Sequence, residues 1–138
     1  MAGDALTDLL IKTARNDGVL AGLIMGEGCI DYHSTPRIRV KMADRPVVDW
    51  IQERYGGTSK PVVASTGRWM WEWYIGGSAC LVLCERLIPL LIGSKARQAD
   101  LLLIMSTFPA ASATRKRLRA ELSELKRISY APDTAIGR

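Results

Sequence analysis

Glu27 is the acidic side chain whose setting most favours metal chemistry. It stands between Gly26 and Gly28, at the end of an apolar stretch that is expected to be helical. A carboxylate at the carboxyl end of a helix lies at the negative end of the helix dipole, and this placement is unfavourable unless a cation compensates it. Mg²⁺ commonly takes one or two carboxylates and fills its shell with water and phosphate. The local sequence therefore favours a compensating cation beside Glu27.

A second group of candidate residues lies on predicted strands. Cations alternate strictly with apolar residues in the segment Arg37, Ile38, Arg39, Val40, Lys41 and Met42. Because successive side chains of a strand point to opposite faces, the three cations share one face. The same face is expected to carry the polar residues of the neighbouring strands, namely Asp31, His33, Lys60, Arg68, Met70, Glu72 and Tyr74. Such a mixture can contact phosphates and base edges, so this face is predicted to bind DNA.

The opposite face is expected to be the core. Trp69, Trp71, Trp73 and Ile75 share it by the same period of two. A tryptophan stripe of this kind is more often buried than used as a platform on which bases stack.

The strands are expected within a single α+β domain. Helices are predicted over 4–14 and 19–26, with a break at 16–18, and then over 46–55, 78–91, 94–107 and 112–127. Strands are predicted over 29–33, 37–42, 59–65 and 68–75. This order predicts a four-stranded antiparallel sheet with helices packed on one face. Residues 1–16 would form a helical extension, 17–108 the core, and 109–138 a basic C-terminal helix and tail.

Composition is compatible with a polyanionic partner. The 138 residues include 19 Lys and Arg against 14 Asp and Glu, a formal charge of +5. Three cysteines without a C-x-x-C pair indicate neither a disulfide framework nor a zinc ribbon. No secretory signal or membrane segment is expected, so we predict a protein that is not secreted and stays where it is made, in the cytoplasm, in an organelle or in the cytosol of a phage host.

The segment Leu20-Ala21-Gly22-Leu23-Ile24-Met25-Gly26-Glu27-Gly28 resembles the motif that names the LAGLIDADG homing endonucleases. Residues 71–75, Leu90-Leu91 and the segment from Lys95 to Asp100 resemble later parts of the same family. The resemblance implies the αββαββα fold with a saddle-shaped sheet. It also implies a site-specific double-strand DNA endonuclease, often intron-encoded. One copy of the motif implies a homodimer.

Within this resemblance, individual positions acquire roles. Glu27 matches the metal-binding acid, with Glu in place of Asp, and Gly26 would add a backbone carbonyl. The metal would be Mg²⁺, and Mn²⁺ or Ca²⁺ could occupy the same site, Ca²⁺ without cleavage. Lys95 matches a basic residue near the cleaved phosphate. Gly22, Leu23 and Gly26 would form the dimer interface, because helices whose facing residues lack a Cβ can approach closely.

Several alternatives stay open. The chain could be an RNA-binding intron maturase whose partner is the host intron RNA, a catalytically silent DNA-binding protein on the same fold, or a structural oligomer. The residue that orients water could be Lys41, Asp44 or Arg45. The basic C-terminal helix could hold flanking phosphates or could simply be solvated.

Overall fold

The first element is one uninterrupted helix. The computed structural model describes residues 2–129, and α1 spans Ala2–Glu27. The predicted break at residues 16–18 is wrong. Asp17 does not cap a new helix; its carboxylate accepts hydrogen bonds from Tyr55 Oη at 2.7 Å and from the Arg86 guanidinium at 2.7 and 2.8 Å. A helical glycine such as Gly18 costs only about 1 kcal/mol relative to alanine, so these tertiary contacts outweigh it.

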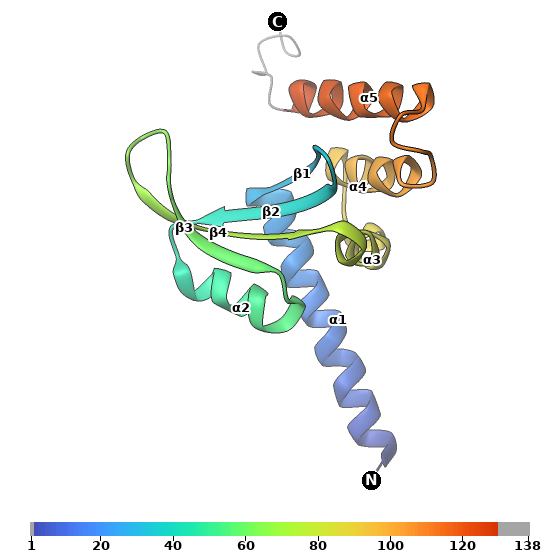
Figure 1. Cartoon of the computed structure of the whole chain (residues 1–138). Helices are drawn as coiled ribbons and strands as arrows, with labels where there is room; N and C mark the ends of the chain where they lie inside the picture. The colour runs from blue at the N-terminus through green and yellow to red at the C-terminus, as the bar shows by residue number, and fades with distance from the viewer. Residues whose placement is uncertain (1, 130–138) are drawn as a thin grey trace, which may run out of the picture.

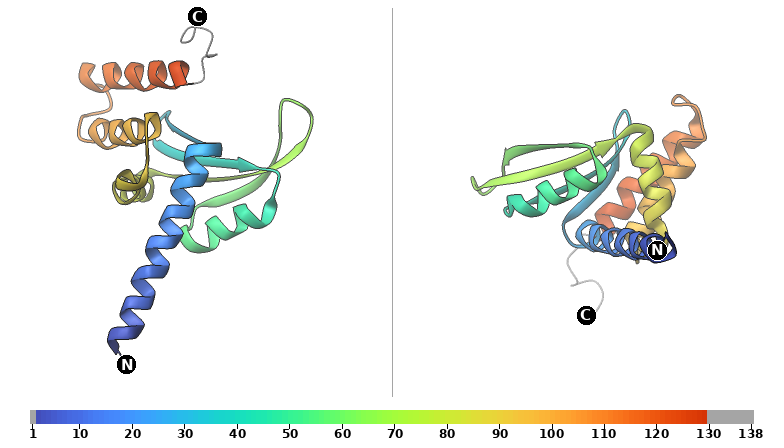
Figure 2. Two further views of the ribbon diagram at one scale, coloured as in Figure 1. Left: turned by 180° about the vertical axis from the view of Figure 1, so that it is seen from behind. Right: turned by 90° about the horizontal axis from the view of Figure 1, so that it is seen from below.

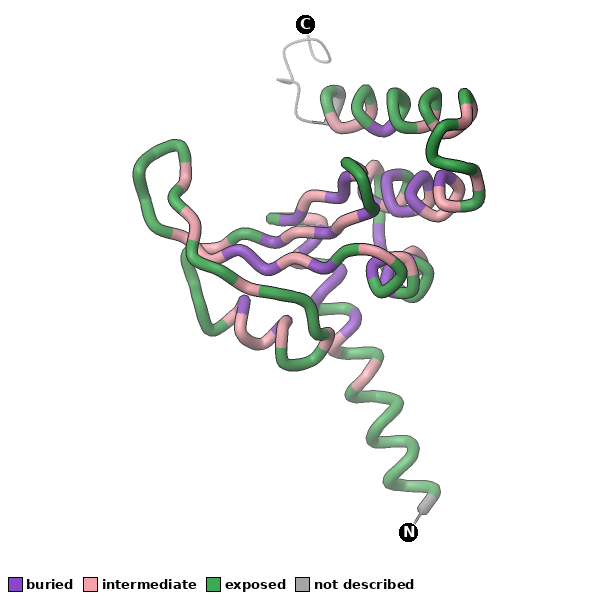
Figure 3. The backbone as a smooth tube through the Cα atoms, in the orientation of Figure 1, coloured by how far each residue is buried: buried purple, intermediate pink, exposed green. Residues whose placement is uncertain are grey.

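The two halves of α1 have different surroundings. The second half crosses the back of the sheet and buries Leu20, Ala21 and Ile24 (Figure 2). The first half projects beyond the rest of the chain (Figure 1) and is exposed along its length (Figure 3). The predicted N-terminal extension and the core therefore share one continuous helix.

Four antiparallel strands form the sheet in the order β1-β2-β4-β3. Their bounds are β1 Gly28–Tyr32, β2 Pro36–Met42, β3 Thr58–Val63 and β4 Trp69–Gly76. The register sets Arg39 opposite Tyr74, and Lys41 opposite Glu72. Lys60 also lies opposite Glu72, from the other side. The predicted alternation is thus realised, and the cations of β2 and β3 share one face.

The remaining helices cover the apolar face and extend past the β1 edge. They are α2 Arg45–Tyr55, α3 Gly77–Leu87, the short 3₁₀ turn η1 Ile88–Leu90, α4 Ser94–Met105 and α5 Ala113–Ser129. In Figure 1, α5 lies on the far side of α4, while the turn between β3 and β4 rises at the opposite end of the curved sheet. The predicted α+β class and four-stranded antiparallel sheet are confirmed.

The tryptophan stripe is only partly core. Trp73 is fully buried, and its indole N–H donates to the carbonyl oxygen of Gly56 at 2.8 Å. Gly57 must be glycine here, because its φ is +84° and a Cβ would lie 2.5 Å from the Tyr74 carbonyl oxygen. Trp69, by contrast, is 68% exposed, which corrects the prediction. It stands at the start of β4, opposite Val63 at the exposed end of β3.

Candidate metal site and nucleic-acid interface

Glu27 is the last residue of α1 and is exposed. It makes no hydrogen bond or ion pair with another described residue. The next residue, Gly28, is tightly enclosed, since a Cβ there would lie 2.6 Å from Ile24 Cα. The turn from helix to strand is therefore fixed, and it holds the Glu27 carboxylate at the point where the sheet begins.

Lys95 lies next to this turn. Its Nζ donates a hydrogen bond to the carbonyl oxygen of Gly28 at 2.7 Å, and the residue is only 8% exposed. The structure thus places Lys95 of α4 against Gly28, the residue that directly follows Glu27, although α1 and α4 are far apart in the chain.

The donors at this point fit a hard divalent cation. Glu27 supplies a carboxylate that is free of internal partners within residues 2–129, and the last turn of α1 directs its carbonyl oxygens, including that of Gly26, toward the same end. No group of three or more His, Cys, Asp or Glu residues within the described part of the chain could hold a metal ion. The carboxylate at the end of α1 is that of Glu27, and one carboxylate is enough for a hard divalent cation whose shell is largely water and phosphate.

One side of α1 carries glycines at a spacing of four. Gly22 and Gly26 are exposed, and a Cβ at either would meet no atom within 4 Å. Gly18 extends the same row, a point that sequence reasoning missed, and the neighbouring Val19 is exposed as well. Leu23 is half-buried. This smooth, uncharged surface lies open beside Glu27.

The polar face of the sheet is organised by two carboxylates. Asp31, predicted to contact DNA, is 5% exposed and receives Arg37 Nε at 3.2 Å and Arg39 Nη2 at 2.8 Å. Burial alone would raise its pKa, but the hydrogen bond from Arg37 and the charges of Arg39, Arg37 and Lys126 together hold the pKa of Asp31 below its ordinary value. Asp31 therefore stays ionised and fixes the arginines in place.

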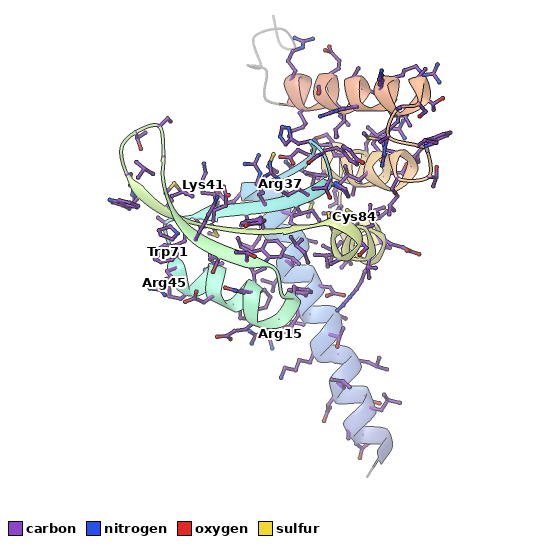
Figure 4. The ribbon with its side chains drawn as sticks, in the orientation of Figure 1. Arg15, Arg37, Lys41, Arg45, Trp71 and Cys84 are labelled. Carbon is purple, nitrogen blue, oxygen red and sulfur yellow. The ribbon has the colours of Figure 1, made fainter. Side chains whose placement is uncertain are left out.

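Glu72 plays a similar part further along the face. It is buried, and its Oε2 lies 3.9 Å from Arg39 Nη1. The more accessible groups are His33, Lys41, Lys60 and Arg68, which are exposed, and Met70 and Tyr74, which are half-buried. Lys60 Nζ lies 5.6 Å from the centre of the Tyr74 ring. Figure 4 shows Arg37 and Lys41 extending from the same side of β2.

Cys29 lies on this face, as the sequence predicted, whereas its partner Lys126 escaped sequence reasoning. Lys126 of α5 donates from Nζ to Cys29 Sγ at 3.0 Å, and Arg39 Nη2 lies 3.5 Å from the same sulfur. Strand alternation alone places Cys29 on the polar face. Nothing local in the sequence indicated Lys126, because the contact joins residues 97 positions apart.

Arg45, one of three candidates for orienting water, is engaged in other contacts. Its guanidinium lies 4.2 Å from the centre of the Trp71 ring, and its Nε lies 3.5 Å from Asp49 Oδ2. Figure 4 shows Arg45 beside Trp71 at the edge of α2. Lys41, Asp44 and Arg45 are all exposed, and the choice among the three stays a prediction.

No known protein-family profile and no curated protein matches the sequence. Solved structures do match. The homing endonuclease I-CvuI in complex with its target superposes with a TM-score of 0.65, over 80% of this chain and 81% of that chain, at 22% identity. The archaeal intron-encoded homing endonuclease I-Vdi141I, complexed with DNA, gives 0.67 over 82% and 85% at 14% identity. The LAGLIDADG meganuclease I-AabMI, bound to uncleaved DNA, gives 0.58 over 77% of this chain and 43% of its own, at 15% identity.

The chain has the LAGLIDADG fold. The expected αββαββα order is confirmed, with α4 and α5 following α3. The segment that resembles the family motif, residues 20–28, forms the end of α1 and its junction with β1 in this fold. Within the described residues, no helix combines the length and apolar character needed to cross a bilayer.

Proposed function

We propose that this chain is one subunit of a homodimeric, metal-dependent, site-specific DNA endonuclease. The observation that carries the proposal is the position of Glu27. An exposed carboxylate ends a helix with a glycine face, beside a cationic sheet face, on a fold shared with DNA-bound homing endonucleases. Those three features together serve phosphodiester hydrolysis better than binding alone.

Two copies would meet through the α1 surface formed by Gly18, Gly22, Leu23 and Gly26. Bare glycine positions let two helix backbones approach closely, and a two-fold axis there would place the two Glu27 carboxylates side by side. Lengths support this arrangement. The chain spans 81% and 85% of the chains of I-CvuI and I-Vdi141I but 43% of that of I-AabMI, so it supplies one αββαββα unit where the longer chain has room for two.

Each Glu27 carboxylate, with the Gly26 carbonyl, would hold Mg²⁺, and crystals of I-CvuI were prepared with Ca²⁺ or Mg²⁺. When bound, the ion would lower the pKa of an attacking water and stabilise charge on the cleaved phosphate. Lys95 would act from the opposite side of the turn. Its Nζ fixes the Gly28 peptide, and its positive charge reduces the cost of bringing a phosphate beside the carboxylate.

The polar face would bind the duplex. Arg37, Arg39, Lys41 and Lys60 can reach phosphates or guanine edges, while His33, Arg68, Met70 and Tyr74 would add contacts in the groove. Asp31 and Glu72 would hold the arginines in fixed positions rather than touch DNA. A preset arrangement of this kind favours one target sequence over many.

The test uses a duplex made by joining the two DNA sequences that flank the inserted element in which the reading frame lies, so that the insertion-free junction is reconstructed. The wild-type protein should cut it in Mg²⁺ and not in EDTA. Glu27→Gln should bind within about twofold of wild type yet leave the DNA intact, because only the metal ligand is lost. Glu85→Gln, another exposed glutamate, should cut normally. Normal cutting by Glu27→Gln would refute the proposal.

Splicing, binding and cleavage assays together separate the rival functions. An intron maturase would promote splicing of its host intron with Glu27 dispensable. A silent DNA-binding protein would bind the joined duplex with salt-sensitive affinity and never cut it. A structural oligomer would show no such affinity.

A further inference from the structure

A cavity lies between the β1–β2 turn and the first turns of α5. Its volume is about 240 Å³. The turn contributes His33 and Ser34, and α5 contributes Arg115, Lys116 and Arg119. Residues three and four apart on a helix lie on one side of it, so the three cations converge on the same opening.

These cations have no carboxylate partner among residues 2–129, whereas two arginines nearby do. Arg97 pairs with Glu121 at 2.7 Å, and Arg127 pairs with Glu124. The two glutamates of α5 thus form ion pairs with other arginines and do not neutralise the cations at the cavity. Uncompensated positive charge is left at the start of the helix, next to the cavity.

Arg115 is held in place by its neighbours, but its guanidinium retains a hydrogen-bond donor without an acceptor among the described residues. Its guanidinium lies 4.8 Å from the centre of the Tyr32 ring, and its backbone N–H donates to Ser112 Oγ at 3.1 Å. Its Nε is buried and has no hydrogen-bond partner within the described residues. A buried donor without an acceptor is costly, and an anion in the cavity would bring acceptors close to this guanidinium.

The cavity adjoins the polar face at the end far from Glu27. α5 runs beside β1 in the opposite direction, since Arg115 meets Tyr32 while Lys126 meets Cys29. The five residues of β1 separate the cavity from Glu27 by about 16 Å at the usual rise of a strand. A duplex lying on the polar face would therefore pass the cavity outside the region that the strands contact.

We propose that this cavity binds a backbone phosphate of duplex DNA that flanks the target, beyond the part covered by the sheet. This inference rests on the proposed function and deepens it. The cavity adds affinity rather than sequence preference, because phosphate oxygens are the same at every step of the duplex.

The test compares two duplexes with the same central site, one trimmed to the part covered by the sheet and one extended by about one helical turn of DNA on each side. The wild-type protein should bind the extended duplex more tightly. Arg119→Gln should reduce the affinity advantage of the extended duplex by about fivefold or more. The slope of log affinity against log salt concentration should also fall by nearly one released ion per subunit. Arg117→Gln removes the same charge from an exposed position of α5 that does not line the cavity, and should keep the advantage.

The inference would be overturned if the wild type bound the two duplexes equally, or if Arg119→Gln and Arg117→Gln had equal effects. Either result would leave the proposed endonuclease function standing. Failure of both duplexes to bind would instead refute the proposed function. A third measurement follows thermal unfolding in inorganic phosphate without DNA. Stabilisation that depends on Arg119, without any effect of duplex length, would assign the cavity to a free anion and overturn the proposal.

Discussion

Lys95 Nζ donates a hydrogen bond to the Gly28 carbonyl oxygen at 2.7 Å, so the first turn of α4 is tied to the peptide that directly follows Glu27. The α1–β1 junction is thus held from two sides. The backbone of Ile24 in α1 packs closely against Gly28, and Lys95 of α4 donates a hydrogen bond to the Gly28 carbonyl oxygen. This arrangement makes the position of the carboxylate depend on a residue 68 positions away in the sequence.

Lys95→Met tests this link. Methionine keeps most of the side-chain length but removes the charge and the hydrogen bond, so we expect cleavage to fall about 100-fold while target binding changes by less than about threefold. Single-turnover cleavage and equilibrium binding are measured on the same preparation. A loss of binding as large as the loss of cleavage would show that Lys95 only maintains the fold, and unchanged cleavage would remove it from the site.

A substitution at Gly22 tests whether two copies meet through the glycine surface of α1. Gly22→Leu should yield a folded monomer, because a Cβ at this position meets no atom of its own chain within 4 Å, whereas the leucine side chain would stand between two α1 helices. Replacing glycine in a helix favours the folded subunit by about 0.5–1 kcal/mol, so loss of dimer cannot then be ascribed to unfolding.

Sedimentation velocity gives the oligomeric state, and circular dichroism gives the stability. Gly3→Leu is the control, since Gly3 also lies in α1 with nothing within 4 Å but far from the other glycines. A dimeric Gly22→Leu would contradict the proposed interface.

Asp31→Asn tests the ion pairs of the polar face. The variant should lose about 1–3 kcal/mol of unfolding free energy at pH 7, because two arginines lose a buried partner. The folded-state pKa of Asp31 lies below its ordinary value of 3.8. The stabilisation is therefore present above that value and is lost as pH falls through the lower folded-state pKa.

Denaturant unfolding at pH 7 and near pH 3 checks both parts of this prediction. The difference between wild type and Asp31→Asn should shrink at the lower pH. Asp49→Asn, which breaks the more exposed pair with Arg45, should cost less than about 0.5 kcal/mol. A difference that grows on acidification would show that the carboxyl is not held ionised by the arginines.

Local patterns predicted the strands and their faces well. The alternation from Arg37 to Met42 was enough to place three cations on one side, because each strand has a fixed period and one face needs a core. The segment 20–28 likewise predicted where the carboxylate would lie. Both features depend on near neighbours in the chain.

What sequence reasoning missed depends on distant partners. Asp17 looked like a helix cap because Asn-Asp-Gly commonly ends helices, yet its partners Tyr55 and Arg86 lie 38 and 69 residues away and keep α1 continuous. Trp69 lies on the same face of β4 as the buried Trp73, so strand alternation predicted it to be in the core. Its strand partner Val63 is itself exposed at the end of β3, and the core does not reach this far. The contact of α5 with Cys29 and Tyr32 was likewise invisible, since it required the packing of α4 to place the last helix.

The most direct test of the central claim uses dimers with one wild-type subunit and one Glu27→Gln subunit, isolated through two different affinity tags and incubated with the joined target in Mg²⁺. If each Glu27 serves one strand, these mixed dimers should nick a single strand and leave the duplex unbroken. Cutting of both strands at the wild-type rate would show that the two carboxylates do not divide the work in this way, as would failure to cut either strand.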